Sequence, residues 1–98
     1  MPRWNYTIDI KDEWDLTKKY GDKVPRVELK KLVDLVHKLI QRLPENLLTW
    51  NLLDALDLLE ESVDDNVEEF ADLDLFNEGW NQLYDWADYN RVWIKTII

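Results

Sequence analysis

The chain has 98 residues, of which 46% are hydrophobic and 34% are charged, a composition that predicts a folded protein and not a disordered one. It contains no cysteine, which excludes disulfide bonds, thiolate metal sites and cysteine nucleophiles. The net charge of −9 disfavours direct binding to nucleic acid, because contacts with a phosphate backbone need lysine and arginine.

The length is that of one domain, so we expect residues 1–98 to form a single acidic helical domain. The first residues lack an apolar core and a cleavage-site pattern, so we expect no signal peptide. No apolar run approaches the ~18 residues needed to cross a bilayer. We therefore expect a cytoplasmic protein that does not act at a membrane.

The first predicted element is a strand over residues 4–10. Its alternating β-formers place four apolar side chains on one face, namely Trp4, Tyr6, Ile8 and Ile10. The charged stretch 11–23 ends in a turn at Gly21. Within it, a short helical turn over 12–19 would be anchored by Trp14 and Leu16.

Two helices are predicted next. Over residues 26–43 apolar side chains recur three and four positions apart, with Pro25 before the first turn and Pro44 after the last. The second helix, over 45–61, is apolar around most of its circumference, which predicts either central burial or docking on a partner. We weight central burial first. The apolar residues outside its main stripe are Leu47, Trp50, Leu53 and Leu58.

The remaining pattern predicts another helix start, a long helix and a strand. Ser62 to Asp65 has the spacing of a capping box, after which Val67, Phe70 and Ala71 would face inward. A long helix is predicted over 72–88, where a close helix–helix approach would offset the cost of Gly79. Residues 91–97 alternate as a strand. The predicted fold is mainly α, a compact bundle of three to four helices with a two-stranded β-ribbon formed by the N- and C-terminal segments.

Charge is distributed unevenly along the chain. Residues 1–43 contain ten Lys/Arg and seven Asp/Glu, whereas residues 44–98 contain two and fourteen. Such dense like charge destabilises a fold, which favours a role in binding over a face that only keeps the protein soluble. The candidate partner-binding carboxylates are Asp54, Asp57, Glu60, Glu61, Asp64, Asp65, Glu68, Glu69, Asp72 and Asp74.

Two aromatic residues of the last helix, Trp86 and Tyr89, do not fit its apolar stripe cleanly. Tryptophan and tyrosine are favoured anchors at protein interfaces, so we add both to the candidate partner-binding residues. The equal alternative is that they cover the terminal ribbon. A further alternative is an accessory or structural subunit that docks through the apolar second helix around Trp50, and self-association is left open.

The sequence offers little for catalysis. His37 is the only histidine and lies on a predicted polar face without a nucleophile beside it, so we expect a surface residue without a catalytic or ligand role. We expect no enzyme, no metal site and no cofactor. One enzymatic alternative is kept, because five carboxylates resemble the Mg²⁺-binding Glu-x-x-Glu … Glu-x-x-Asp pattern of all-α nucleoside triphosphate pyrophosphohydrolases: Glu60, Glu61, Asp64, Asp85 and Asp88.

A nine-residue stretch from Phe76 to Tyr84 carries one further resemblance. Six of its residues match a stretch of the small, acidic, phage-encoded anti-CRISPR proteins that inhibit Cas9: Phe76, Gly79, Trp80, Asn81, Gln82 and Tyr84. The resemblance covers less than a tenth of the chain. It implies an acidic surface that occupies a nucleic-acid site on its target, and it carries no functional residue over.

The leading hypothesis is therefore a small acidic binding protein, an inhibitor or DNA mimic of the phage or mobile-element anti-defence kind. Carboxylates spaced along its helices would imitate a phosphate array and occupy the basic nucleic-acid site of a protein partner. The expected partner is a protein with a basic surface, with no direct binding of nucleic acid.

Overall fold

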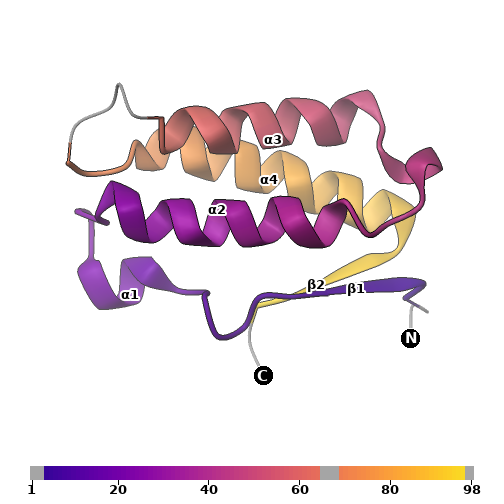
Figure 1. Ribbon diagram of the computed structural model, residues 1–98, viewed down its shortest axis with the longest axis horizontal. Coiled ribbons are helices and arrows are strands. Elements are labelled where there is room, and N and C mark those ends of the chain that lie inside the picture. The colour runs from indigo at the N-terminus through magenta and orange to yellow at the C-terminus, as the bar shows by residue number, and fades with distance from the viewer. Residues whose placement is uncertain (1–3, 65–68, 97–98) are drawn as a thin grey trace.

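The computed structural model describes residues 4–64 and 69–96 and shows helices stacked over a small sheet (Figure 1). Along the described chain the elements are β1 (Tyr6–Asp9), α1 (Leu16–Tyr20), α2 (Arg26–Ile40), a 3₁₀ turn η1 (Glu45–Leu47), α3 (Trp50–Ser62), α4 (Leu73–Asn90) and β2 (Val92–Lys95). The predicted mainly α fold, with paired terminal strands, is confirmed. No described helix is both long and apolar enough to cross a membrane.

The two strands pair in parallel, with Tyr6 opposite Val92 and Ile8 opposite Ile94. A tight hairpin cannot join parallel strands, and here the helices provide the long crossover that such a pair requires. The predicted apolar face of the first strand is buried only in part, because Ile8 and Ile10 are 1% exposed whereas Trp4 and Tyr6 are 38% and 37% exposed. On β2, Val92 and Ile94 are at most 5% exposed. Figure 1 shows the sheet on the opposite side of the molecule from α3.

Helix α2 follows the predicted amphipathic pattern and lies between the sheet and α3 in Figure 1. Its buried residues are spaced three and four apart: Leu29, Leu32, Val33, Val36 and Ile40. The helix ends at Ile40, three residues before the predicted end. Leu43 nevertheless stays half-buried against the core, so the apolar period continues past the last helical turn.

The predicted second helix is two elements. A 3₁₀ turn ends at Leu47, Leu48 and Thr49 leave the helical path, and α3 then begins at Trp50. The predicted helix start at Ser62 is wrong, because Ser62 is the last residue of α3. Its buried hydroxyl donates a hydrogen bond of 2.6 Å to the carbonyl of Leu59 instead of capping a new helix.

The segment before α4 differs from prediction at one side chain. Ala71 is buried as expected, whereas Phe70 is 40% exposed, with Lys23 Nζ 6.0 Å from its ring centroid. Phe70 instead uses its backbone, in an antiparallel bridge with Pro25. Val67, Asp65 and Glu68 lie outside the described residues.

An aromatic stack ties the N-terminal segment to α4. The ring centroid of Trp80 lies 5.0 Å from that of Trp14 and 5.4 Å from that of Phe76. Trp14 and Leu16, the predicted anchors of the short first helix, both pack against the core. Because stacked aromatic rings stabilise a contact beyond the effect of the area that they bury, the stack holds the loop between β1 and α2 against the helices.

Candidate partner-binding surface

Helix α3 presents a row of carboxylates to solvent. Its buried residues, which include Leu52, Ala55 and Leu59, recur at helical spacing and turn one side toward the core. Four carboxylates occupy the other side and Asp64 follows shortly after the last helical residue, and all five are exposed: Asp54, Asp57, Glu60, Glu61 and Asp64. We call these residues the α3 row.

Helix α4 carries a second row. Asp72 caps the helix, its carboxylate accepting hydrogen bonds from the backbone N–H groups of Asp74 and Leu75 at 3.1 and 3.2 Å. Exposed carboxylates then follow the helix to its end: Asp74, Glu78, Asp85 and Asp88. We call these four the α4 row, and the two rows together the acidic face.

All described carboxylates between Asp54 and Asp88 point outward. This stretch of sequence holds thirteen, of which Asp65 and Glu68 are outside the described residues, and the other eleven are exposed, Glu69 among them. Most of these eleven carboxylates have no lysine or arginine partner among the described residues, whereas on α2 Nζ of Lys30 lies 3.3 Å from Oδ2 of Asp34. Among the described residues, no lysine or arginine pairs with Asp54, Asp57 or Glu61. A field of unneutralised carboxylates attracts a cationic partner.

Gly79 brings the two helices that carry these rows close together. A Cβ atom at this position would lie 2.9 Å from the Cβ of Leu58 and 3.0 Å from the carbonyl oxygen of Ala55. The side chain of Gln82 adds a hydrogen bond of 3.1 Å to the carbonyl of Asn51. The acidic face therefore stands on two helices in direct backbone contact.

The two aromatic candidates of the last helix differ in their exposure to solvent. Tyr89 is 89% exposed and stays a candidate. Trp86 is only 2% exposed, and its Nε1 donates a hydrogen bond of 2.7 Å to the carbonyl of Leu47. The expectation that Trp86 contacts a partner is thus corrected, because its ring fills the core and its one polar atom is satisfied there.

The start of α3 is less buried than expected. Trp50 is 80% exposed and Leu53 is 45% exposed, so central burial, which we weighted first for this helix, fails at these two positions. Trp50 lies at the head of the α3 row, because side chains three and four residues apart are neighbours on a helix. The sequence could have indicated this position, because Trp50 precedes Asp54 by four residues and such residues lie on the same side of a helix.

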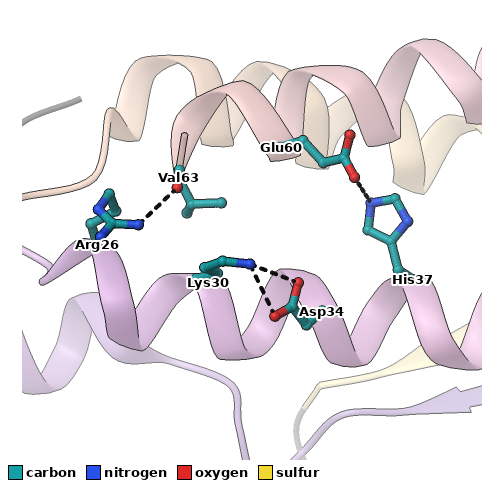
Figure 2. A network of polar contacts seen from close by, with 6 residues as sticks. All are labelled: Arg26, Lys30, Asp34, His37, Glu60 and Val63. Carbon is teal, nitrogen blue, oxygen red and sulfur yellow. Dashed lines mark hydrogen bonds and ion pairs between the residues drawn. The ribbon is translucent and has the colours of Figure 1, made fainter. Parts of the chain in front are cut away.

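Residues of α2 and α3 line a groove between the two helices. Figure 2 shows His37 of α2 contacting Glu60 of α3. Nε2 of His37 lies 3.1 Å from Oε1 of Glu60, close enough for an ion pair when the imidazole is protonated, although Nε2 makes no hydrogen bond within the described residues. The imidazole is half-buried and bridges two helices, so the prediction of a plain surface histidine missed this contact.

Two hollows open into this groove. One measures about 270 Å³ and is mostly polar, lined by Lys30, Val33, Asp34, Glu60, Val63 and Asp64. Arg26 lies near it, with Nη1 donating to the carbonyl of Val63 at 3.3 Å (Figure 2). The other also measures about 270 Å³, and its apolar lining comes from Ile40, Leu48, Leu53 and Leu56.

The five carboxylates of the pyrophosphohydrolase pattern do not converge. Because α3 and α4 are antiparallel, with Gly79 beside Ala55, Glu61 lies near the start of α4 whereas Asp85 and Asp88 lie near its end. Twelve residues separate positions 73 and 85 along α4, which corresponds to ~18 Å at the helical rise. Among the described residues, no three His, Cys, Asp or Glu side chains form a group suited to a metal ion.

Comparison with protein-family models, with curated proteins and with solved structures found no match. The stretch that resembles anti-CRISPR proteins lies on α4, where Phe76, Gly79 and Trp80 are buried. Half of its six matching residues thus serve packing within the helical layer. The resemblance contributes nothing to the choice of binding residues.

Proposed function

We propose that this protein acts by binding a protein partner that has a basic surface, and that it does so through the acidic face. The observation that carries the proposal is the exposure of every described carboxylate between Asp54 and Asp88, without matching lysine or arginine partners for most of them. Burying these groups against cations of a partner would relieve their mutual repulsion, so free energy lost in the isolated fold would be recovered in the complex.

Competition with nucleic acid for that basic surface is part of the proposal. Within α3, the row places four carboxylates over residues 54–61, which span ~10.5 Å of helix, so successive charges are ~3.5 Å apart on average. One strand of B-DNA carries one phosphate per ~3.4 Å of helix axis. The row therefore matches the linear charge density of a single strand, which supports a role as an inhibitor or DNA mimic.

The test uses two variants with equal loss of charge. The α3 variant combines Asp54→Asn, Asp57→Asn and Glu61→Gln, and the matched variant combines Asp12→Asn, Glu13→Gln and Asp22→Asn, which are exposed residues of the N-terminal region. Affinity capture from the host, quantified by mass spectrometry, identifies proteins that the native chain retains. We expect the α3 variant to lose the partner, the matched variant to keep it, and added duplex DNA to displace it.

Salt dependence supplies an independent criterion. Screening shortens the reach of charges from ~10 Å at 0.1 M salt to ~3 Å at 1 M, so affinity should fall steeply over this range. Equal retention by the two variants, or retention that is indifferent to salt, would rule out the acidic face as the binding surface.

A second candidate is the non-catalytic accessory subunit, favoured by the exposure of Trp50 and Leu53. An exposed tryptophan beside an exposed leucine is an unusual exposure of apolar surface on a helix whose outer side otherwise carries carboxylates. For a subunit of this kind, Trp50→Ala should abolish assembly at any salt concentration. The α3 charge variant should then assemble as well as the native chain, which separates the two candidates.

A further inference from the structure

The apolar hollow between α2 and α3 has the size for side chains and not for a small-molecule ligand. Its volume of about 270 Å³ lies below the range of ~300–1,000 Å³ typical of small-molecule sites. The floor comes from Ile40 and Leu56, which are buried, and the open side from Leu48 and Leu53, which are partly or largely exposed. One or two apolar side chains from another molecule would complete this cluster.

Trp50 extends the apolar surface beyond the hollow. It lies one helical turn before Leu53 and is 80% exposed, so most of its ring meets solvent. Tryptophan is among the residues that contribute most to protein–protein affinity when a partner covers it. The hollow and Trp50 together offer an apolar anchor point at the first half of α3.

Carboxylates surround this anchor point and continue from it. Asp57 lines the apolar hollow itself, and Asp54 lies one turn after Trp50. Further along the groove, the polar hollow is lined by Lys30 and by three carboxylates, Asp34, Glu60 and Asp64. With Arg26 near it, the charges there sum to −1. An occupant of the groove therefore needs an apolar residue at one end and cations at the other.

We propose that this groove receives an amphipathic helix of the partner protein, with an apolar residue in the hollow and Lys/Arg residues over the carboxylates of α3. The inference rests on the proposed function, because it identifies the part of the basic partner that the acidic face and groove recognise. Complementarity of charge and of apolar surface selects the occupant, since a second copy of this chain that docked through the same face would bring carboxylates against carboxylates.

The secondary structure of the occupant follows from the walls of the groove. Both walls are helices, whose interior backbone groups are already hydrogen-bonded, so an extended peptide would find no sheet edge to pair with. From Trp50 to Ser62, α3 rises by ~18 Å, which a helix of about twelve residues would match. Side chains three, four and seven residues apart on such a helix would face the groove together.

The experiment uses a synthetic peptide with leucines at helical spacing and lysines at its other positions, labelled for fluorescence anisotropy. A scrambled peptide keeps the composition without the apolar face, and a third peptide has glutamate in place of each lysine. The groove variants are Trp50→Ala and Leu53→Ala. Their matched controls are Trp93→Ala and Val27→Ala, which truncate residues that are 40% and 54% exposed and that line neither hollow. Circular dichroism establishes that each variant is folded.

We expect the amphipathic lysine peptide to bind, with each groove variant weakening it about tenfold and neither control changing it. The scrambled peptide should bind much more weakly. Equal binding of both lysine peptides, lost only in the α3 charge variant, would overturn the groove and leave the proposed function standing. No binding of either lysine peptide at low salt would count against both.

Two further outcomes would identify other occupants. Binding of the glutamate peptide as tightly as the lysine peptide would overturn the inference in favour of a purely apolar contact, as the subunit hypothesis requires. A dimer of the native chain that Trp50→Ala converts to a monomer, measured by sedimentation, would overturn it in favour of a second copy of this chain.

Discussion

Gly79→Ala tests the close approach of α3 and α4 on which the acidic face is built. In an open helix, this substitution stabilises by about 1 kcal/mol, because alanine has the higher helix propensity. Here the new Cβ would meet the Cβ of Leu58 at 2.9 Å, the carbonyl oxygen of Ala55 at 3.0 Å and the amide nitrogen of Leu59 at 3.1 Å. Two of these three atoms belong to the backbone of α3, so relief requires the helices to separate.

The magnitude follows from these opposing effects. Overpacking of a close-packed interior costs about 1–3 kcal/mol, and backbone contacts place this case toward the upper end. After the gain in propensity, we expect a net destabilisation of about 1–2 kcal/mol. For a domain of this size that corresponds to a fall in Tm of roughly 4–16 °C.

Thermal and urea denaturation followed by circular dichroism measure the effect. Asn81→Ala is the matched control, because Asn81 is exposed on the same helix and its replacement changes propensity without new contacts. We expect the control to be neutral or slightly stabilising. If Gly79→Ala raised the Tm as the control does, the direct backbone contact between the two helices would be refuted.

Three other substitutions test the burial, the capping and the charge described above. Trp86→Phe should destabilise by about 1–3 kcal/mol in urea denaturation, because the carbonyl of Leu47 loses its buried donor, and a change below measurement error would contradict that bond. Asp72→Ala should lower the free energy of unfolding by about 1 kcal/mol, because it removes the cap of α4. Asp72→Asn should lower it little, because asparagine also caps helices. Equal losses of stability in the two variants would show that the charge of Asp72 matters and its capping hydrogen bonds do not. The α3 charge variant, which neutralises three carboxylates, should melt at a higher temperature than the native chain. Added salt should reduce this difference, because both the substitutions and the salt weaken repulsion between the carboxylates of the α3 row. A lower melting temperature at low salt would show that repulsion within the α3 row is negligible.

The helices could be predicted where their apolar period was strong. α2 and α4 were found because their buried residues recur three and four apart, and this period survives in the folded chain. The helix ends were predicted less accurately, since Leu43 continues the apolar period after α2 has ended at Ile40. Local patterns report which side of a segment is apolar, and the hydrogen bonds that end a helix depend on its neighbours.

Whether each tryptophan is buried or exposed could not be predicted, for a different reason. Trp50 and Trp86 both lie on amphipathic helices outside the cleanest apolar stripe, yet one is 80% exposed and the other 2%. Burial of Trp86 leaves its N–H group satisfied, because the carbonyl of Leu47, 39 residues away in sequence, accepts a hydrogen bond from it. Only the tertiary arrangement decides which of two similar side chains is covered.

The acidic part of the candidate site was predictable, and the groove was not. Thirteen carboxylates without a cation among them in sequence are expected to be exposed, since unpaired charges are rarely placed in a protein interior, and the eleven that the structure describes are exposed. The groove, in contrast, depends on the separation of α2 and α3, which the contact of His37 with Glu60 spans. Sequence spacing within one helix holds no information about the distance to another.

Mapping the surface that a captured partner touches tests the central claim most directly. Backbone amide chemical shifts of the labelled protein, recorded while the unlabelled partner is added, report which residues change environment. We predict that the perturbed amides lie on the outer sides of α3 and α4 and along the α2–α3 groove, with Asp54, Asp57 and Glu61 among the largest changes. Perturbations confined to the β1–β2 sheet, on the opposite side of the molecule from α3, would contradict the account.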